Sequence, residues 1–345
     1  YDLFAQYALV AVAEALRDSG FEVDKSDAER AGVIWSTGVG GLTSFFEEVT
    51  DYAGGDGTPR FSPFFIPRMI PDLAAGYISI KYGFKGPNYC VSSACASSNH
   101  GLISAMDQIR AGRADVMIAG GSEAVVNIPG VGGFNAMQAL STRNDDPKHA
   151  SRPFDVARDG FVMGEGAAAL VLEEYGHAVA RGAKIYCEFA GGGMSADAFH
   201  MTAPDPEGNG AMKSMKDALA EAGMTPAEVD YVNVHGTSTQ LGDIAELKAM
   251  ERLFGEDIYN VNISSTKSMT GHLLGAAAAV EALACIFAIE KGIVPPTINV
   301  VEVDPAIDHR LNLTLGTAQK RDVRTAMSNT FGFGGHNSTV VFRKL

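Results

Sequence analysis

A cysteine among very small neighbours is the residue of this chain best suited to chemistry. Cys95 lies in VSSACASSNHG (91–101), where no bulky or charged side chain occurs before His100. A strand-like stretch precedes it and a helix is predicted from about Ala96 to Arg110, which places the sulfur at a strand-to-helix turn. The positive end of a helix dipole favours a thiolate, and a backbone N–H there can face a developing oxyanion. The pattern predicts a nucleophile; a small, buried structural cysteine is the alternative.

Two histidines and a lysine follow other predicted strands. His235 ends the strand VDYVNV and precedes GTSTQLGD, where α/β sheets present functional groups; a surface histidine capping a turn is the alternative. Lys267 and His272 lie in STKSMTGHLLG, before an alanine-rich helix, although a lysine near a helix N-terminus opposes the dipole. Glu281 lies within that otherwise apolar helix. We predict that Lys267 and Glu281 form a partly buried ion pair, and that the lysine lends its charge to an adjacent site.

The remaining motifs narrow the chemistry. Between two predicted strands, SNTFGFGGHNSTVVF (328–342) contains an FGFGG loop with bare N–H groups and aromatic side chains that can swing. Ser122, in GGSEA, lacks the second glycine of a GxSxG elbow. No HExxH or spaced Cys/His set predicts zinc, so no metal is expected. Neither GVGG segment completes the GxGxxG of a nucleotide-binding loop.

Strand-like runs alternate with helical runs along the chain, which favours an α/β fold with mostly parallel sheet. The predicted strands are AGVIWS, DVMIAGG, ALVLEEY, VDYVNVH and STVVFRK, and the predicted helices are HGLISAMDQIRAG, GAMKSMKDALAEAG, DIAELKAMERLFG and HLLGAAAAVEALACIFAIEKG. Around GHAVARGAK (176–184) one βα series ends and another begins. We therefore predict two halves, residues 1–182 with the cysteine and residues 183–345 with both histidines and the lysine.

A faint internal repeat supports this division. VSSACASSNHG aligns without gaps on ISSTKSMTGHL (263–273), which places His100 over His272 and Cys95 over Lys267. Duplication and chance explain the match about equally well. If the halves are related, the cysteine and the lysine–histidine segment occupy equivalent corners and can meet between the halves.

Composition excludes several classes of protein. The 345 residues include 27 basic and 41 acidic side chains, a net charge of −14, whereas nucleic-acid binding needs a basic surface. The longest apolar run, 276–289, is too short to span a bilayer and contains Glu281. The four cysteines form no CxxC pair and no signal peptide precedes them, so we expect reduced thiols in the cytoplasm.

The first residues, YDLFAQYALVAVAEAL, predict a helix with one buried face and no N-cap. A sheet built from successive βα units would then lack its first strand. Unpaired N–H and C=O groups along a central strand cost about 1–3 kcal/mol each. We expect the natural protein to carry a further N-terminal strand in the sheet of the first half.

Four motifs, taken in order, resemble those of the β-ketoacyl-[acyl carrier protein] synthases, the type II condensing enzymes of fatty acid synthesis: SSACASS, VHGTSTQLGD, SSTKSMTGHLLGAA and NTFGFGGHN. The stretch 139–167 is also similar, and the match covers nearly the whole chain except the family's first strand–helix unit. The resemblance implies a thiolase-like fold, with two related halves in five α-β-α-β-α layers, assembled as a homodimer. It implies a decarboxylative Claisen condensation with malonyl-[acyl carrier protein] that lengthens a fatty acyl chain by two carbons.

The resemblance also implies catalytic roles. It makes Cys95 the acylated nucleophile, and it assigns His235 and His272 to the carbonyl oxygen of the malonyl thioester. That role needs neutral imidazoles, so a nearby Lys267 that lowers their pKa fits it. The backbone N–H groups of Cys95 and Phe333 would form a second oxyanion hole, and Phe333 resembles the family's gating phenylalanine.

Further positions follow from the same resemblance. Thr237 and Thr239 match the residues that bind the phosphopantetheine arm. Val39 and Phe65 match the acyl pocket, with Phe65 contributed by the partner subunit. No cofactor is implied, because the acyl carrier protein brings the phosphopantetheine. His336 stands where many members have threonine.

Other assignments are weighed against these motifs. A thiolase would have a second reactive cysteine near the C-terminus, where this chain has FGFGGHN, and a chalcone-synthase-like enzyme would have asparagine as the second partner instead of His272. A ketosynthase or a non-catalytic acyl-binding subunit of a polyketide pathway remains the alternative, although such subunits usually lose the nucleophile that is retained here. The candidates for docking an acidic carrier protein are Arg60, Arg68, Lys81 and Lys85.

Overall fold

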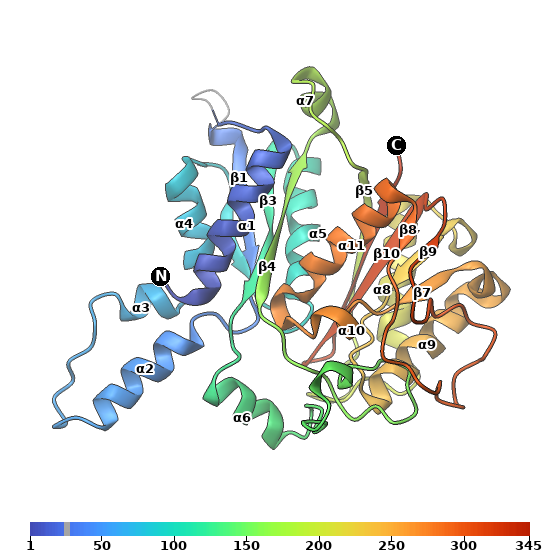
Figure 1. The fold of residues 1–345 in the computed structure, drawn as a ribbon. Helices are drawn as coiled ribbons and strands as arrows, with labels where there is room; N and C mark the ends of the chain where they lie inside the picture. The colour runs from blue at the N-terminus through green and yellow to red at the C-terminus, as the bar shows by residue number, and fades with distance from the viewer. Residues whose placement is uncertain (24–27) are drawn as a thin grey trace.

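The computed structural model describes residues 1–23 and 28–345, which fold around two β-sheets (Figure 1). The first sheet has the strand order β2-β1-β3-β4 and the second has the order β5-β11-β10-β6-β7, while β8 and β9 form a separate antiparallel pair. The strands are Ala31–Ser36 (β1), Asn88–Val91 (β2), Val116–Glu123 (β3), Gly166–Glu173 (β4), Glu188–Ala196 (β5), Tyr231–Asn233 (β6), Asn262–Ser264 (β7), Ile293–Val294 (β8), Gln319–Lys320 (β9), Thr325–Gly332 (β10) and His336–Arg343 (β11).

Both sheets are mixed, whereas the sequence predicted mostly parallel sheet. In the first sheet β1 is parallel to β2 and β3, but β3 and β4 are antiparallel. In the second sheet β6 is parallel to β7 and β10, but β11 is antiparallel to β10 and to β5. One reason is the connection from β10 to β11, which holds only residues 333–335. A connection this short joins antiparallel neighbours, because parallel strands need a long crossover.

Helices lie against both faces of each sheet. α1 and α4 pack on the first sheet, α5 and α11 lie between the two sheets, and α8 packs on the second sheet with α9 beside it (Figure 1). None of the described helices is long and apolar enough to cross a membrane. The helices are Leu3–Ser19 (α1), Leu42–Ala53 (α2), Phe65–Met69 (α3), Leu73–Tyr82 (α4), Ser97–Arg110 (α5), Ile128–Ala136 (α6), Tyr175–Ala180 (α7), Asn209–Ala222 (α8), Gln240–Phe254 (α9), Lys267–Thr270 (α10) and Ala277–Lys291 (α11).

The first helix has an N-cap, so the prediction of an uncapped helix was wrong. α1 begins at Leu3, and the side chain of Asp2 accepts a hydrogen bond from Phe4 N at 3.4 Å. The same carboxylate accepts from Ser44 N at 2.9 Å. One short acidic side chain therefore satisfies orphan N–H groups at the starts of both α1 and α2.

Among the described residues the first sheet has a free edge at each of its two outer strands, β2 and β4. β4 pairs with β3, and no other described strand pairs with its second edge. A cavity of about 770 Å³ lies beside this edge, with Leu170, Ile286 and Phe189 among the residues that line it. The central strands β1 and β3 have partners on both sides. The unpaired groups are therefore at the margin of the sheet, not beside a central strand as predicted. The predicted division near residue 182 falls between α7 and β5 and stays a prediction.

Candidate active site

Cys95 lies in the tight turn between β2 and α5. Ala94 has a φ of +51°, a left-handed conformation that is strained for a residue with a Cβ. The turn is held because Ser93 N donates to Ser97 Oγ at 2.9 Å and Ser97 Oγ donates to Ala94 O at 2.6 Å. α5 begins at Ser97, one residue later than predicted, with Ala96 at its N-cap. The strain is typical of a turn that must present one side chain in one direction.

The thiol of Cys95 is neutral at rest. Burial raises its pKa to about 12, and the charge of Glu123 adds to the rise. Lys267 opposes this rise through its charge, and hydrogen bonds from the backbone of Phe333 and of Cys95 itself also lower the pKa. The position at a helix N-terminus therefore does not by itself produce a thiolate, as the sequence had suggested.

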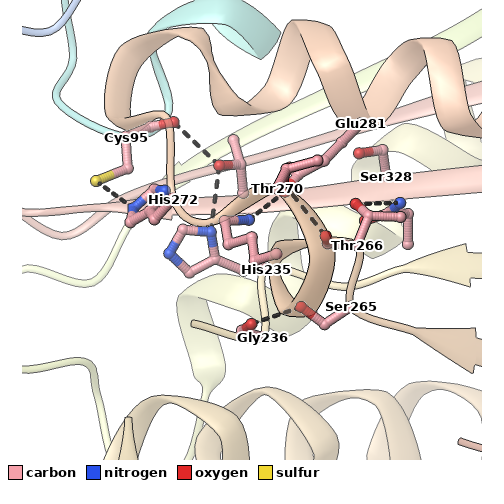
Figure 2. A network of polar contacts seen from close by, with 12 residues as sticks. Cys95, His235, Gly236, Ser265, Thr266, Thr270, His272, Glu281 and Ser328 are labelled. Atoms are coloured by element: carbon pink, nitrogen blue, oxygen red, sulfur yellow. Dashed lines mark hydrogen bonds and ion pairs between the residues drawn. The ribbon is translucent and has the colours of Figure 1, made fainter. Parts of the chain in front are cut away.

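His272 brings an imidazole against the thiol. Its Nε2 lies 3.1 Å from Cys95 Sγ (Figure 2). The backbone of His272 is fixed by a hydrogen bond from its N–H to Val162 O at 2.7 Å, and its ring packs edge-on against Phe161 with centroids 5.2 Å apart. The stretch 139–167 therefore supports the histidine from outside its own segment.

The turn after His272 differs from the prediction. The alanine-rich helix was predicted to begin at the histidine, but α11 begins at Ala277. Leu274 has a φ of +49°, and a 3₁₀ turn over Leu274–Ala276 separates the histidine from the helix. A left-handed residue cannot continue an α-helix, so the histidine is held on a separate turn.

His235 follows β6 and faces the same space. Its N–H donates to Glu246 Oε1 and the N–H of Gly236 donates to Glu246 Oε2, each at 2.9 Å. The rings of His235 and His272 have centroids 5.3 Å apart and are nearly perpendicular, at 86° (Figure 2). Both rings and Cys95 line one cavity of about 490 Å³. Two imidazoles and a thiol therefore converge on one substrate-sized space.

Both imidazoles are neutral. Burial lowers the pKa of His235 well below its usual value, and the charge of Lys267 lowers it further. Burial, and then Lys267, lower the pKa of His272 in the same way. A neutral imidazole has one N–H to donate and one nitrogen that accepts. The pair can therefore donate to an oxygen that becomes negative during a reaction.

The predicted ion pair between Lys267 and Glu281 is confirmed. Lys267 Nζ donates to Glu281 Oε1, and the two side chains are 1% and 2% exposed. Burial raises the pKa of Glu281, and the lysine opposes that shift. Neither side chain lines the cavity, and the lysine affects the pKa of both histidines through its charge.

Not all the other predicted site residues lie at this cavity. Thr237, Thr239 and Phe333 line it, and the two threonine Oγ1 atoms are 3.1 Å apart. Val39 and Phe65 do not line it. Val39 follows β1, and its N–H donates to Glu123 at 3.2 Å. Phe65 begins α3 and stacks on two aromatic rings of its own region.

His336 is also absent from the lining of the cavity. It begins β11, paired with Gly332 of β10 and with Ala196 of β5. Its ring centroid lies 6.3 Å from that of His100 on α5, at 84°. The histidine therefore belongs to the base of the loop that carries Phe333.

Glu123, at the end of β3, is a site residue that sequence reasoning missed. It is fully buried, and its carboxylate accepts from Thr37 Oγ1 at 2.7 Å, Gly38 N at 2.7 Å and Gly275 N at 3.0 Å. It thus joins the loop after β1 to the turn that follows His272. An acid within the apolar run DVMIAGGSEAVV was the available signal, because a buried carboxylate needs several donors.

Arg158 is a second missed residue. It is 1% exposed, and it donates from Nε to Thr239 O at 3.1 Å and from Nη2 to Gln240 O at 2.9 Å. It also forms ion pairs with Asp243 at 3.3 Å and with Asp304 at 2.8 Å. The arginine therefore fixes the start of α9 and the threonine loop before it. Sequence alone does not distinguish it from the partly exposed Arg143 nearby.

Protein-family models match both parts of the chain. The model described as "Beta-ketoacyl synthase, N-terminal domain" matches residues 1–178, and "Beta-ketoacyl synthase, C-terminal domain" matches residues 186–301. The chain is 48% identical over 345 residues to a "3-oxoacyl-[acyl-carrier-protein] synthase 2" of Vibrio harveyi, and 46% identical over 344 residues to the protein of that name from Coxiella burnetii. Each alignment covers 100% of this chain and 82% of the relative.

Solved structures of ketosynthases also resemble this chain. A β-ketoacyl synthase from Burkholderia phymatum superposes with a TM-score of 0.92 at 40% identity, over 99% of this chain and 82% of that one. A complex described as a "type II PKS acyl-carrier protein in complex with its ketosynthase bound to the hexaketide" matches with a TM-score of 0.94 at 36% identity, over 99% and 85% of the two chains.

Proposed function

The chain belongs to the β-ketoacyl synthase family, and we propose from this premise that Cys95 carries an acyl group that His235 and His272 help to join to a malonyl unit. The reaction is that of a 3-oxoacyl-[acyl-carrier-protein] synthase 2: a decarboxylative Claisen condensation that lengthens a fatty acyl chain by two carbons. The observation that carries the residue assignment is the convergence of Sγ and both imidazoles on one cavity.

The first stage transfers the acyl group to the enzyme. Sγ of Cys95 bonds to the acyl carbonyl carbon, and the thioester bond to the phosphopantetheine of acyl carrier protein breaks. The thiol proton ends on the departing pantetheine sulfur, and His272 Nε2, 3.1 Å from Sγ, is placed to relay it. Thr237 and Thr239 are proposed to hold the pantetheine arm, with Arg158 fixing their loop from below.

The second stage forms the carbon–carbon bond. Malonyl thioester loses CO₂, and the electron pair of the broken bond passes into its carbonyl, whose oxygen accepts from the neutral His235 and His272. The carbanion carbon attacks the acyl-Cys95 carbonyl, and the N–H groups of Cys95 and Phe333 stabilise the resulting oxyanion. The adduct then collapses, its carbon–sulfur bond to Cys95 breaks, and the 3-oxoacyl product leaves on the carrier protein. The thiolate of Cys95 takes a proton from solvent. No group besides the carrier protein's own phosphopantetheine takes part, so no cofactor is proposed.

The proposed assembly is a homodimer with a thiolase-like fold, two related halves divided near residue 182 and five α-β-α-β-α layers. Two features support a dimer: β2 is an outer strand with a free edge, and the segment of α2 and α3 projects from the body (Figure 1). This segment exposes apolar side chains that a partner would bury, namely Phe45, Val49, Tyr52, Phe61, Phe64 and Ile66. Each acyl pocket would then contain Val39 of its own subunit and Phe65 contributed by the other subunit. The proposed compartment is the cytoplasm, where four free cysteines stay reduced.

A polyketide ketosynthase is the second candidate, because the chain superposes on one with a TM-score of 0.94. The non-catalytic subunit of such a pair fits poorly, because the thiol and both imidazoles are present and in contact. The two catalytic candidates differ in their acyl substrate and not in their chemistry.

One experiment tests the function. The protein is incubated with acyl-[acyl carrier protein] and malonyl-[acyl carrier protein], and the carrier-bound products are identified by mass spectrometry. A 3-oxoacyl product two carbons longer than the primer supports the proposal, and Cys95→Ala should form none. Conversion of 3-oxoacyl primers but not of saturated ones would favour the polyketide candidate. Absence of any elongated product with all primers would reject both.

A further inference from the structure

Thr330 joins the cysteine turn to His235. It lies on β10 with no exposed surface. Its Oγ1 donates to the carbonyl oxygen of Cys95 at 3.0 Å, and Nδ1 of His235 lies 3.3 Å from the same Oγ1. One hydroxyl thus contacts the main chain of the nucleophile and the ring that faces it across the cavity.

The position of this hydroxyl is fixed by the strand around it. Gly332, two residues further along β10, lies so close to the cysteine turn that a Cβ there would be 2.8 Å from Ser93 O and 3.1 Å from Cys95 N. On the other side of Thr330, Asn329 donates to Met215 Sδ at 3.3 Å and to Glu246 Oε1 at 3.2 Å. The strand therefore cannot shift away from either group without breaking contacts.

The hydroxyl has one proton for two acceptors. While the Thr330 hydroxyl donates to Cys95 O, it can only accept from His235. The His235 proton is then on Nδ1, and Nε2 is an acceptor. In the other tautomer the proton is on Nε2 and the hydroxyl can turn to donate to Nδ1. The ring passes between the two tautomers by losing one proton to solvent and taking up another, so its charge does not change. Nε2–H can then donate into the cavity. An enolate oxygen of a malonyl thioester requires this second arrangement.

We propose that Thr330 is a positioning residue for condensation, whose hydroxyl orients the His235 ring and places its proton on Nε2. The inference rests on the proposed function, because only the decarboxylation stage needs a donor at that nitrogen. Loading of Cys95 needs the thiol and His272, neither of whose reacting atoms contacts Thr330.

Two substitutions at one position separate the hydroxyl from the volume. Thr330→Val keeps the shape and removes the hydroxyl, whereas Thr330→Ser keeps the hydroxyl. Ser328→Ala is the matched control: Ser328 is fully buried two residues earlier, on the same face of β10, and within the described residues its Oγ has no hydrogen-bond partner. Loading is measured as the rate of acyl-enzyme formation by intact mass, and condensation as the rate of product formation. Thermal unfolding of each variant verifies the fold, and Thr330→Ala replaces Thr330→Val if the valine variant does not fold.

Thr330→Val is expected to lose about tenfold or more in condensation while loading stays within about threefold, because one hydrogen bond that acts in only one stage is removed. Thr330→Ser should restore condensation to within about threefold of the wild type, and Ser328→Ala should match the wild type. Equal losses in loading and condensation, or a serine variant as slow as the valine variant, would overturn the proposal.

A readout without substrate keeps this test separate from the proposed function. The protein is labelled with ¹⁵N-histidine, and the NMR signals of the His235 ring are identified because they are missing from the spectrum of His235→Asn. The chemical shifts of the two ring nitrogens report which of them carries the proton. Thr330→Val should change the ring-nitrogen shifts of His235 and leave those of His272 unchanged. Unchanged His235 shifts would reject the role of Thr330 whether or not the wild type condenses acyl groups. Absence of product with normal shift changes would reject only the function.

Discussion

Replacing Lys267 and Glu281 separates the stability of the buried ion pair from its effect on the histidines. The two side chains are 1% and 2% exposed. Lys267→Met leaves a carboxylate buried without its partner, and breaking such a pair by removing one member costs about 3–5 kcal/mol of unfolding free energy. Lys267→Met/Glu281→Leu removes both charges and fills similar volume, and such replacements are often neutral or stabilising by about 1–4 kcal/mol. Urea unfolding should therefore find the single variant strongly destabilised and the double variant close to the wild type.

The double variant should regain stability without regaining the condensation activity of the wild type. The charge of Lys267 lowers the pKa of both His235 and His272, so its loss raises both pKa values, although burial still holds them down. Protonation of the two imidazoles then begins at a higher pH. On acidification, the condensation rate of the double variant should therefore begin to fall at a higher pH than that of the wild type. We expect lower turnover than in the wild type at acidic pH, since a protonated imidazole repels its neighbour and no longer fits the neutral donor role. A double variant with wild-type turnover and an unchanged pH dependence would refute the reasoning.

Three further predictions follow from the contacts of the site. His235→Ala and His272→Ala should each lower condensation on the order of a hundredfold, and loading should suffer more in His272→Ala, because only His272 touches Cys95 Sγ; equal loading rates in stopped-flow assays would contradict this. Glu123→Gln should cost about 1–3 kcal/mol in urea unfolding, because one of its oxygens becomes an amide that faces backbone N–H donors; a variant as stable as the wild type would show that the carboxylate is not needed there. Arg158→Met should lower the free energy of unfolding by about 3–5 kcal/mol, because it leaves a buried aspartate without its ion-pair partner. It should also raise the KM for carrier-bound substrates, because the threonine loop is no longer fixed; an unchanged KM in steady-state kinetics would show that the arginine does not act through that loop.

The positions of the proposed catalytic residues could be picked out from the sequence because each lies near the end of a predicted strand or the start of a predicted helix. Cys95 and His235 follow short strand-like runs and His272 precedes an alanine-rich run, and local patterns of this kind need no knowledge of distant contacts. The pairing of Lys267 with Glu281 was predictable for another reason: a charge in an apolar context needs a partner, and the two are 14 residues apart.

The supporting residues were not predictable in this way. Glu123 accepts from groups 84 to 86 residues before it and 152 residues after it, and Thr330 contacts a carbonyl 235 residues away. Such contacts depend on how the two sheets pack, which no local pattern encodes. The neutral thiol of Cys95 was missed for the same reason, because burial by distant segments outweighs the local helix dipole in setting its pKa.

The most direct test of the account follows the acyl group on the protein itself. The enzyme is loaded from acyl-[acyl carrier protein], digested and mapped by mass spectrometry, before and after addition of malonyl-[acyl carrier protein]. The account predicts one acylated peptide, containing Cys95, which loses its acyl group on addition of malonyl carrier while one CO₂ is released per group discharged. An acyl group on Cys90, Cys187 or Cys285, or a discharge of acyl-Cys95 without CO₂, would contradict it.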